Sequence, residues 1–374
     1  MQITDNKIKV LHVVGRMDRG GAEALLMNLL RSIDRTKFQY DFVEQTEDIC
    51  DHDEEILASG SKIYRVPHIS VKNLKQYRMW WRTFFQQHPE YRIVHGHSRG
   101  SAPIYLDEAN RAGRITIAHC HNNSHGKGLK GFIRFIWQLP LRNMADYNFA
   151  CSMDSGLSQF GSRGKFELVK NGIQTEKYKW NMTYREKHRQ ALGVENSFVV
   201  GNVARFEPQK NHEFLIRVFA EIKKRQKNAK LLLVGQGTLE EEIRKQIRVL
   251  GLEEDVLFTG VRADVNELLQ AMDVFVFPSH FEGLPLAMVE AQTAALPCFA
   301  SEKAITPEVK LTDLVHFISL QESPAYWADT ILANSIPPEQ RRDTRQDIVA
   351  AGFDIQSTCD WLCRFYEGVL DHHA

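Results

Sequence analysis

The chain has 374 residues, which is enough for two domains of ordinary size, each with its own hydrophobic core. Hydrophobic residues make up 43% and charged residues 25%, the composition of a water-soluble globular protein, and no run of 18 apolar residues predicts a membrane-spanning helix. The formal net charge is zero. Residues 1–170 contain 24 Lys and Arg against 18 Asp and Glu, and this positive charge is not dense enough to predict a nucleic-acid-binding face.

The N-terminal half alternates short apolar segments with amphipathic ones, the pattern of a parallel α/β domain. The first seven residues are largely polar and run straight into an apolar segment, so no secretory signal is expected. Helices are predicted over residues 22–33 and 74–87. Strands are predicted over residues 10–14, 40–43, 62–66, 92–95, 116–120 and 147–151.

The pattern restarts after residues 169–174, where Asn171-Gly172 is a strong turn signal. We therefore predict two doubly wound parallel sheets in series, in domains over residues 1–170 and 171–352. A last helix within residues 353–374 is apolar along one face and needs a surface to cover. The second domain has predicted strands over residues 198–203, 231–234, 256–259, 274–277 and 297–300, and helices over 212–224, 239–250, 264–271 and 286–295.

The cysteines indicate a reducing compartment. Six are present, at positions 50, 120, 151, 298, 359 and 363, and most lie in apolar surroundings without the spacing of a paired framework. A cytoplasmic protein is expected on this ground.

The segment from Pro278 to Glu290 carries the most information about function. It follows an apolar strand, and a helix that opens at Glu282-Gly283-Leu284-Pro285 would point free N–H groups at an anion. Carboxylates repel phosphate, so Glu282 and Glu290, roughly 12 Å apart on a helix that rises 1.5 Å per residue, would bind neutral groups on either side of it. A nucleotide sugar, a pyrophosphate with a sugar at each end, has this form.

Two cations are predicted at the same edge of the second sheet. Arg205 and Lys210 follow the strand over residues 198–203, and ligands of open α/β sheets bind beyond the carboxyl ends of the strands. A basic pair is often only solvated surface, but its convergence with the Glu282 turn favours a pyrophosphate site.

Two further strand ends are candidates for ligand contact. Gly20-Gly21 precedes the first predicted helix and would let a phosphate or sugar approach the backbone; a mobile turn is the alternative. Arg262 ends the loop after the strand over residues 256–259, where it could help to form a wall for a nucleobase.

Histidines gather at two strand ends of the first domain: His95 with His97, and His119 with His121, followed by His125. Because side chains alternate along a strand, each pair shares a face. A metal site would need a third ligand that the spacing does not supply, so no metal is predicted. A hydrogen-bonding or acid–base role at the edge of the site and plain core packing both stay open.

Residues 127–142 mix basic and bulky apolar side chains. This composition suits a segment that rests on an anionic membrane interface, in keeping with the net positive charge of residues 1–170. An ordinary amphipathic helix that faces the core is the alternative, and the pattern favours it slightly.

In sum, these motifs resemble the retaining glycosyltransferases of the GT-B fold, the glycosyl-transferase-one family, over nearly the whole chain. Within that family, the amino-acid sequences of several segments resemble those of bacterial capsular and exopolysaccharide transferases. One loop departs from many relatives, because residues 301–308 lack a Gly-Gly pair. The resemblance rests on Gly20-Gly21-Ala-Glu23, Val169-Lys-Asn-Gly-Ile173, Val203-Ala-Arg205-Phe, Gln209-Lys210-Asn211, Leu233-Val-Gly-Gln-Gly237, Asp273-Val-Phe-Val-Phe-Pro-Ser279, and Glu282-Gly-Leu-Pro with Glu290.

The resemblance implies two Rossmann-like domains facing a cleft, with acceptor binding in the first, donor binding in the second, and the C-terminal helix crossing back onto the first. It also implies site roles: Arg205 and Lys210 for the donor pyrophosphate, Glu282 for hydroxyls of the transferred sugar, and Glu290 for the ribose. His121 would lie beside the sugar. Backbone groups of Gly20, Gly21, Gly283 and Leu284 would complete the donor site.

The implied activity is that of a hexosyltransferase that moves a sugar, with retention and without a metal or other cofactor, from a nucleotide sugar. A UDP-sugar is the expected donor, and a growing, lipid-linked exopolysaccharide or capsule glycan the expected acceptor. The implied location is the cytoplasm, with a peripheral contact at the inner face of the cell membrane left open. Two alternatives remain: a nucleotide-sugar epimerase of the same fold, and a subunit that binds the nucleotide sugar without turnover.

Overall fold

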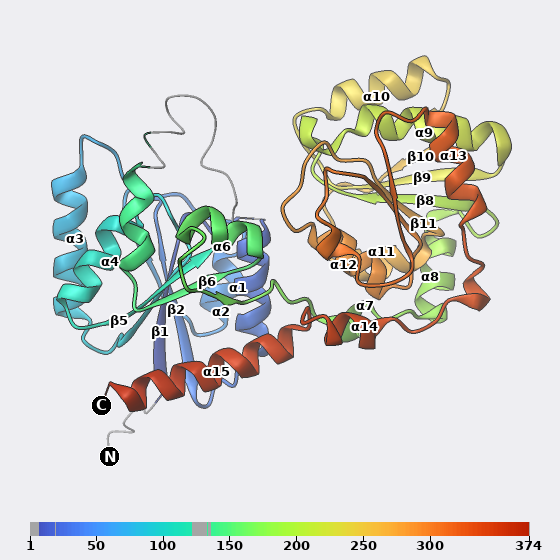
Figure 1. Cartoon of the computed structure of the whole chain (residues 1–374). Coiled ribbons are helices and arrows are strands. Elements are labelled where there is room, and N and C mark those ends of the chain that lie inside the picture. Colours follow the sequence, from blue (N-terminus) through green and yellow to red (C-terminus); the bar gives the residue numbers. More distant parts are fainter. Residues whose placement is uncertain (1–6, 19, 122–132, 134–135, 374) are drawn as a thin grey trace. The chain divides into compact units, whose positions relative to one another are not determined.

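The computed structural model describes residues 7–18, 20–121, 133 and 136–373 (Figure 1). Its contacts divide the chain into two compact units. Unit 1 contains residues 1–172 together with residues 355–374, and unit 2 contains residues 173–354. The chain therefore passes from one unit to the other twice.

Unit 1 is built on a seven-stranded sheet in which all paired strands are parallel. The strand order β3-β2-β1-β4-β5-β6-β7 reverses direction between β1 and β4, which makes that point a topological switch. The strands are β1 (Ile8–Val14), β2 (Phe38–Glu44), β3 (Ile63–Arg65), β4 (Ile93–Gly96), β5 (Ile115–Cys120), β6 (Tyr147–Ala150) and β7 (Glu167–Leu168). The helices are α1 (Gly21–Ser32), α2 (Asp53–Ala58), α3 (Leu74–Gln87), α4 (Ala102–Arg111), α6 (Met153–Phe160), α15 (Ile355–His372) and the 3₁₀ turn η1 (Leu139–Asn143).

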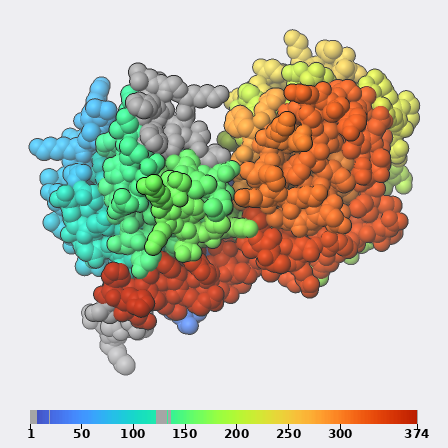
Figure 2. All heavy atoms as spheres, in the orientation of Figure 1, coloured from blue at the N-terminus to red at the C-terminus, as the bar shows by residue number. Residues whose placement is uncertain are grey.

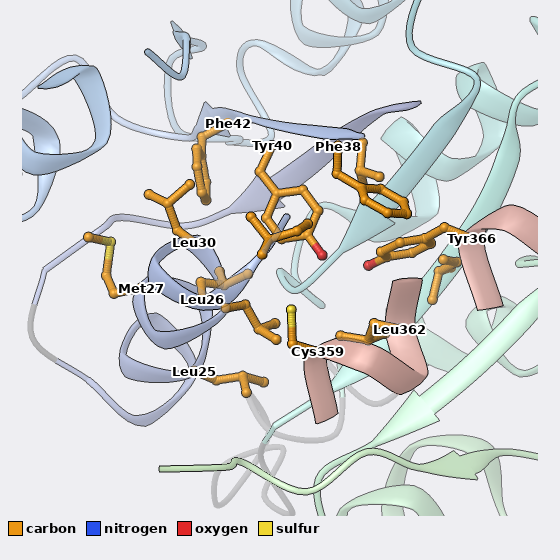
Figure 3. Packing of buried hydrophobic residues seen from close by; sticks show 14 of the residues in the cluster. Leu25, Leu26, Met27, Leu30, Phe38, Tyr40, Phe42, Cys359, Leu362 and Tyr366 are labelled. Carbon is orange, nitrogen blue, oxygen red and sulfur yellow. The ribbon is translucent and has the colours of Figure 1, made fainter. Parts of the chain in front are cut away.

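Helices cover both faces of this sheet. The core of one face is aromatic and includes Trp81 of α3 and Tyr105 of α4. On the other face α1 and α15 pack side by side, and Leu362 and Tyr366 of α15 point at Tyr40 of β2 (Figure 3). In the space-filling view, red atoms from the C-terminal end of the chain lie against the green atoms of unit 1 (Figure 2). The last helix thus completes the core of the first unit.

Unit 2 repeats the same topology with six parallel strands in the order β10-β9-β8-β11-β12-β13, and its switch point lies between β8 and β11. The strands are β8 (Phe198–Val203), β9 (Ala229–Val234), β10 (Val256–Phe258), β11 (Val274–Phe277), β12 (Cys298–Ser301) and β13 (Val315–Ile318). The helices are α7 (Thr175–Tyr178), α8 (Met182–Leu192), α9 (His212–Arg225), α10 (Glu240–Val249), α11 (Val265–Ala271), α12 (Leu286–Thr293), α13 (Pro324–Ala333) and α14 (Arg345–Ala350).

Apolar runs explain why the central strands of unit 2 are buried. Val274–Phe277 has no polar residue, as expected for a parallel strand that is covered on both faces. One core contains residues of α11, α12 and α14, and the other contains residues of α9, α10 and α13. The predicted class of two doubly wound α/β sheets is confirmed.

A buried cluster of charge fixes the start of β11. The Asp273 carboxylate accepts hydrogen bonds from Arg185 (2.5 Å) and Arg189 (3.1 Å), and the Arg341 guanidinium donates to the carbonyl oxygens of Met272 (2.9 Å) and Asp273 (3.2 Å). Backbone carbonyls also accept hydrogen bonds from Arg185 and Arg189, whereas Nε and Nη1 of Arg341 are buried without a partner among the described residues. We assign the cluster a structural role.

No helix among the described residues is long and apolar enough to cross a membrane.

If α15 completes the core of unit 1, Leu362→Ala should loosen unit 1 alone. The Leu362 side chain is fully buried, so we expect a loss of about 2–5 kcal/mol of local stability. Hydrogen-exchange mass spectrometry should show faster exchange in peptides from β1 and α1, with unit 2 peptides unchanged. Arg364→Ala, on the exposed side of the same helix, is the control. Equal protection in both variants would contradict the packing described here.

Candidate functional site

The switch point of unit 2 brings together the loops after β8 and β11. The first loop contains the short turn η2 (Pro208–Lys210), and the second contains Glu282. The Lys210 ammonium and the Glu282 carboxylate form an ion pair at 2.6 Å, with only 15% and 7% of the two side chains exposed. An acidic and a basic group, distant in sequence, therefore meet at the edge of the sheet where ligands bind in this class of fold.

Further hydrogen bonds fix these two loops against each other. The amide of Gln209 donates to the second oxygen of Glu282 (3.2 Å) and to the Phe281 carbonyl (2.7 Å). The Asn211 amide donates to the Pro278 carbonyl (3.0 Å). Lys210 also lies 4.9 Å from the centre of the Phe277 ring, within cation–π range. These contacts fix the two loops against each other.

The helix after β11 begins later than predicted. We expected it to open at Glu282–Pro285, but α12 starts at Leu286 and Pro285 is its N-cap residue, with extended backbone angles (φ −76°, ψ 100°). The N–H of Glu282 is instead donated to the Ala304 carbonyl (2.8 Å), which holds Glu282 in a loop. The spacing of roughly 12 Å between Glu282 and Glu290 along one helix is therefore wrong.

Glu290 lies on α12, and its carboxylate accepts a hydrogen bond of 2.8 Å from the Tyr178 hydroxyl. Burial raises the pKa of the carboxyl group, and the Tyr178 hydrogen bond opposes that shift. Tyr178 ends α7, close to the first passage between the units. It was not identified from the sequence, because no local signal links it to a residue 112 positions away.

The two predicted arginines of unit 2 differ in their surroundings. Arg205 is exposed after β8 and forms no ion pair with a described residue. Arg262 is paired with Asp264 through two hydrogen bonds of 2.7 and 2.8 Å. Gly283 is exposed with open space around its Cα, and Leu284 packs against the core. Of the two arginines, Arg205 is thus the one whose charge is not already paired with a carboxylate of the described residues.

Gly235 has a structural reason to be glycine. Its φ is +138°, and a Cβ atom there would lie 2.1 Å from the Ala204 carbonyl oxygen. A Cβ atom at Gly237 would likewise lie 2.5 Å from the Phe206 carbonyl oxygen. This Gly-x-Gly sequence therefore lets the loop after β9 pack on the loop that carries Arg205.

In unit 1 the predicted glycines stand at the start of α1. Gly20 is the N-cap residue, without a side-chain cap, and Gly21 is the first helical residue. The Asn171 amide donates to the Gly21 carbonyl at 3.5 Å, and Asn28 donates to the Gly172 carbonyl at 3.3 Å. The segment before the first passage is therefore tied to the N-terminus of α1.

Five histidines form two hydrogen-bonded rows on one face of β1, β4 and β5. The first row joins His12 Nδ1 to His97 Nε2 (3.1 Å) and His97 Nδ1 to His121 Nε2 (2.9 Å). The second row joins the Tyr366 hydroxyl to His95 Nδ1 (2.7 Å) and His95 Nε2 to His119 Nδ1 (3.1 Å). The predicted pairs do share a face, since the rings of His119 and His121 stack with centroids 4.2 Å apart.

Burial keeps these imidazoles neutral. It lowers the pKa of His12 to about 3 and that of His121 to about 4, where a hydrogen-bonding effect of Asn171 opposes the shift. The pKa values of His95, His97 and His119 are also well below the ordinary range, with burial the main cause and neighbouring histidines adding to it. His125 lies outside the described residues.

Among the described residues, three groups have ligand atoms close enough to hold a metal ion. His12–His95–His97 and His97–His119–His121 consist of neutral imidazoles that already bind one another. The third, Glu44–Cys50–Asp53, is buried beside Arg65, which pairs with Asp53. Burial raises the pKa of Glu44 to about 7.

Comparison with known proteins identifies the family. Residues 19–177 match the model described as Glycosyltransferase Family 4, and residues 184–346 match Glycosyl transferases group 1. A putative glycosyltransferase of Bacillus subtilis, EpsF, is 34% identical over 96% of both chains. The chain belongs to this glycosyltransferase family.

Two other proteins resemble this glycosyltransferase over most of its length. The UDP-Gal:alpha-D-GlcNAc-diphosphoundecaprenol alpha-1,3-galactosyltransferase of Escherichia coli is 24% identical and covers 80% of this chain and 81% of its own. The crystal structure of Anabaena Alr3699/HepE in complex with UDP has a TM-score of 0.77 at 22% identity, over 97% of this chain and 100% of the other. The fold is thus GT-B, as predicted.

Gly235→Ala tests the close packing that orients the Arg205 loop. An alanine would force its Cβ against the Ala204 carbonyl in a backbone conformation that disfavours side chains, so we expect unit 2 to lose about 1–3 kcal/mol of stability. Thermal unfolding followed by circular dichroism would measure the loss. Gly283→Ala, where a Cβ meets open space, is the matched control and should unfold like the wild type.

Proposed function

We propose that this glycosyltransferase is a retaining hexosyltransferase that takes a sugar from a UDP-sugar and adds it to a growing, lipid-linked exopolysaccharide or capsule glycan. The observation that carries the proposal is the pairing of Lys210 with Glu282 at the switch point of unit 2. A cation for phosphate and a carboxylate for hydroxyl groups stand there in contact, as a nucleotide sugar requires.

In this proposal the donor pyrophosphate binds Lys210 and the open Arg205, with the backbone N–H groups of Gly283 and Leu284. On donor binding, Glu282 leaves Lys210 and accepts hydrogen bonds from hydroxyls of the transferred sugar. The cations then stabilise the charge that develops on the departing phosphate.

The ends of the donor molecule have their own contacts. Glu290, oriented by Tyr178, accepts hydrogen bonds from the ribose. Arg262, which is held by Asp264, lines the nucleobase wall.

Unit 1 is proposed to bind the acceptor and to contribute a smaller part of the donor site. Gly20 and Gly21 would offer backbone N–H groups at the start of α1. His121 would contact the sugar as a neutral hydrogen-bonding group, because burial lowers its pKa to about 4.

The proposed chemistry needs no enzymic nucleophile. The acceptor hydroxyl oxygen attacks the anomeric carbon on the face from which the nucleoside diphosphate leaves. The bond from that carbon to the phosphate oxygen breaks, and the acceptor proton passes to that oxygen, so configuration is retained. Two cations and backbone donors would take over the role that a divalent metal plays in other transferases, and no cofactor is required.

The relatives support the choice of donor and acceptor. HepE was crystallised with UDP and also with UDP-glucose, and the Escherichia coli relative is a UDP-galactose enzyme that acts on a diphosphoundecaprenol-linked sugar. A Staphylococcus aureus relative is a capsular polysaccharide biosynthesis glycosyltransferase. A lipid-linked acceptor would bring the enzyme to a membrane from the cytoplasmic side.

The proposed membrane contact lies at the start of η1. Ile133, Ile136, Trp137 and Leu139 are exposed apolar side chains there, and bulky apolar residues of this kind suit a membrane interface. They belong to the basic and apolar segment 127–142, part of which lies outside the described residues.

Nucleotide binding is the first test. Calorimetric titration of the purified protein should give one-to-one binding of UDP that is unchanged by EDTA, and GDP should bind more weakly. Glu290→Ala should weaken UDP binding by about tenfold or more, since the proposed acceptor of the ribose hydroxyls is lost. Glu322→Gln, an exposed carboxylate of unit 2, should bind UDP normally. Binding that needs a divalent ion would contradict the metal-independent site.

Turnover separates an enzyme from a binding subunit. Arg205→Ala combined with Lys210→Ala should lower kcat by about 10³-fold or more if both cations stabilise the leaving phosphate. The exposed pair Lys227→Ala with Lys245→Ala is the control for lost positive charge. Near-normal transfer in the first variant would place the phosphate site elsewhere. Conversion of the free nucleotide sugar without acceptor would favour the epimerase alternative.

A further inference from the structure

The hydrogen bonds of the row His12–His97–His121 restrict which ring nitrogen of each histidine carries a proton. A neutral imidazole has one nitrogen that donates and one that accepts a hydrogen bond. His97 uses both nitrogens, at 3.1 Å to His12 and 2.9 Å to His121. It therefore donates to one neighbour and accepts from the other, so the row has only two possible directions.

Asn171 distinguishes the two directions. Its amide nitrogen faces the Gly21 carbonyl, which can only accept, so its Oδ1 is turned away from that contact. The side chain of Asn171 also acts on the His121 imidazole and raises its pKa, against the larger effect of burial. Neither Asn171 Oδ1 nor His121 Nδ1 has a hydrogen-bond partner in good geometry among the described residues. If His121 has its proton on Nδ1, one of these two atoms is a donor, His121 Nδ1–H, and the other is an acceptor, Asn171 Oδ1.

The other end of the row does not decide between the directions. His12 Nε2 is buried and has no described partner, whether it carries a proton or a lone pair. With the proton of His121 on Nδ1, its Nε2 must accept from His97 Nδ1–H, and His97 Nε2 must accept from His12 Nδ1–H. Every hydrogen bond of the row is then satisfied in one direction.

We propose that His97, itself oriented by His12, is a positioning residue that holds neutral His121 in the tautomer with its proton on Nδ1. His121 then presents a fixed N–H donor beside Asn171. The role of that donor rests on the proposed function: it would bind a hydroxyl oxygen of the sugar, and the opposite tautomer would present a lone pair instead. His97 need not touch the substrate to affect transfer.

The chemistry of the row favours hydrogen bonds between the imidazoles over coordination of a metal ion. His97 Nδ1 and His121 Nε2 face each other at hydrogen-bond distance, and the two groups of possible metal ligands that include residues of this row contain only neutral imidazoles. A divalent ion there would be buried without an anionic ligand, which is costly. Binding of Zn²⁺ is therefore an outcome that would count against the proposal.

Two substitutions at His97 give a matched test. The amide of asparagine reaches the position of histidine Nδ1, and that of glutamine reaches the position of Nε2. His97→Asn can therefore still donate to His121, whereas His97→Gln keeps only the contact with His12. Tyr366→Phe is the control, because it disrupts the second row and not the first.

The readout is the nitrogen NMR spectrum of the histidine rings in the full-length protein labelled with ¹⁵N-histidine, with His121 assigned by its loss in His121→Gln. We expect a protonated Nδ1 and a bare Nε2 at His121 in the wild type, in His97→Asn and in Tyr366→Phe. His97→Gln should show a mixture of tautomers. A proton on Nε2 in the wild type, an unchanged His97→Gln spectrum, or tight one-to-one binding of Zn²⁺ that is lost in His97→Gln would overturn the proposal.

Transfer assays separate this proposal from the proposed function. His97→Gln should lower kcat by about tenfold with little change in KM for the UDP-sugar, and His97→Asn should recover part of the loss. If the wild type transfers no sugar while the spectra behave as expected, the proposed function fails and the histidine row stands. If kcat of His97→Gln equals that of the wild type, the positioning role fails although the enzyme is active.

Discussion

Parallel pairing of β8 with β11 is the constraint on which the site of unit 2 depends. The register places Val274 beside Val200, and the chain leaves the two strands on opposite sides of the sheet. Loops distant in sequence must then meet beyond the strand ends, and the contact between Lys210 and Glu282 is a direct result. Because both strands are buried on both faces, the apolar core of unit 2 holds this meeting point rigidly.

The same constraint has a different chemical result in unit 1. Pairing of β1, β4 and β5 lines up side chains at the carboxyl ends, and these are histidines. Packed away from water, they are neutral and bind one another. Unit 1 therefore offers oriented hydrogen-bonding groups without charge, whereas unit 2 offers a paired cation and anion.

The sequence predicts the strands and the strand-end residues well, because apolar runs and the rules for parallel sheets are local or general. It fails where a tertiary contact decides. The start of α12 depends on the bond between Glu282 and the Ala304 carbonyl, which no periodicity reveals. Tyr178 and Asn171 find partners more than a hundred residues away. Strand β13 was missed because it is short and contains His316 among its four residues.

The place of α15 in the core of unit 1 has a consequence for biosynthesis. Unit 2 is one continuous stretch of chain, so it can fold as soon as residue 354 has left the ribosome. Unit 1, although translated first, lacks Cys359, Leu362 and Tyr366 until the final helix emerges, and the apolar face of α1 and β2 stays uncovered until then. The N-terminal unit is thus the last to mature, and during translation its exposed face is the natural target for a chaperone.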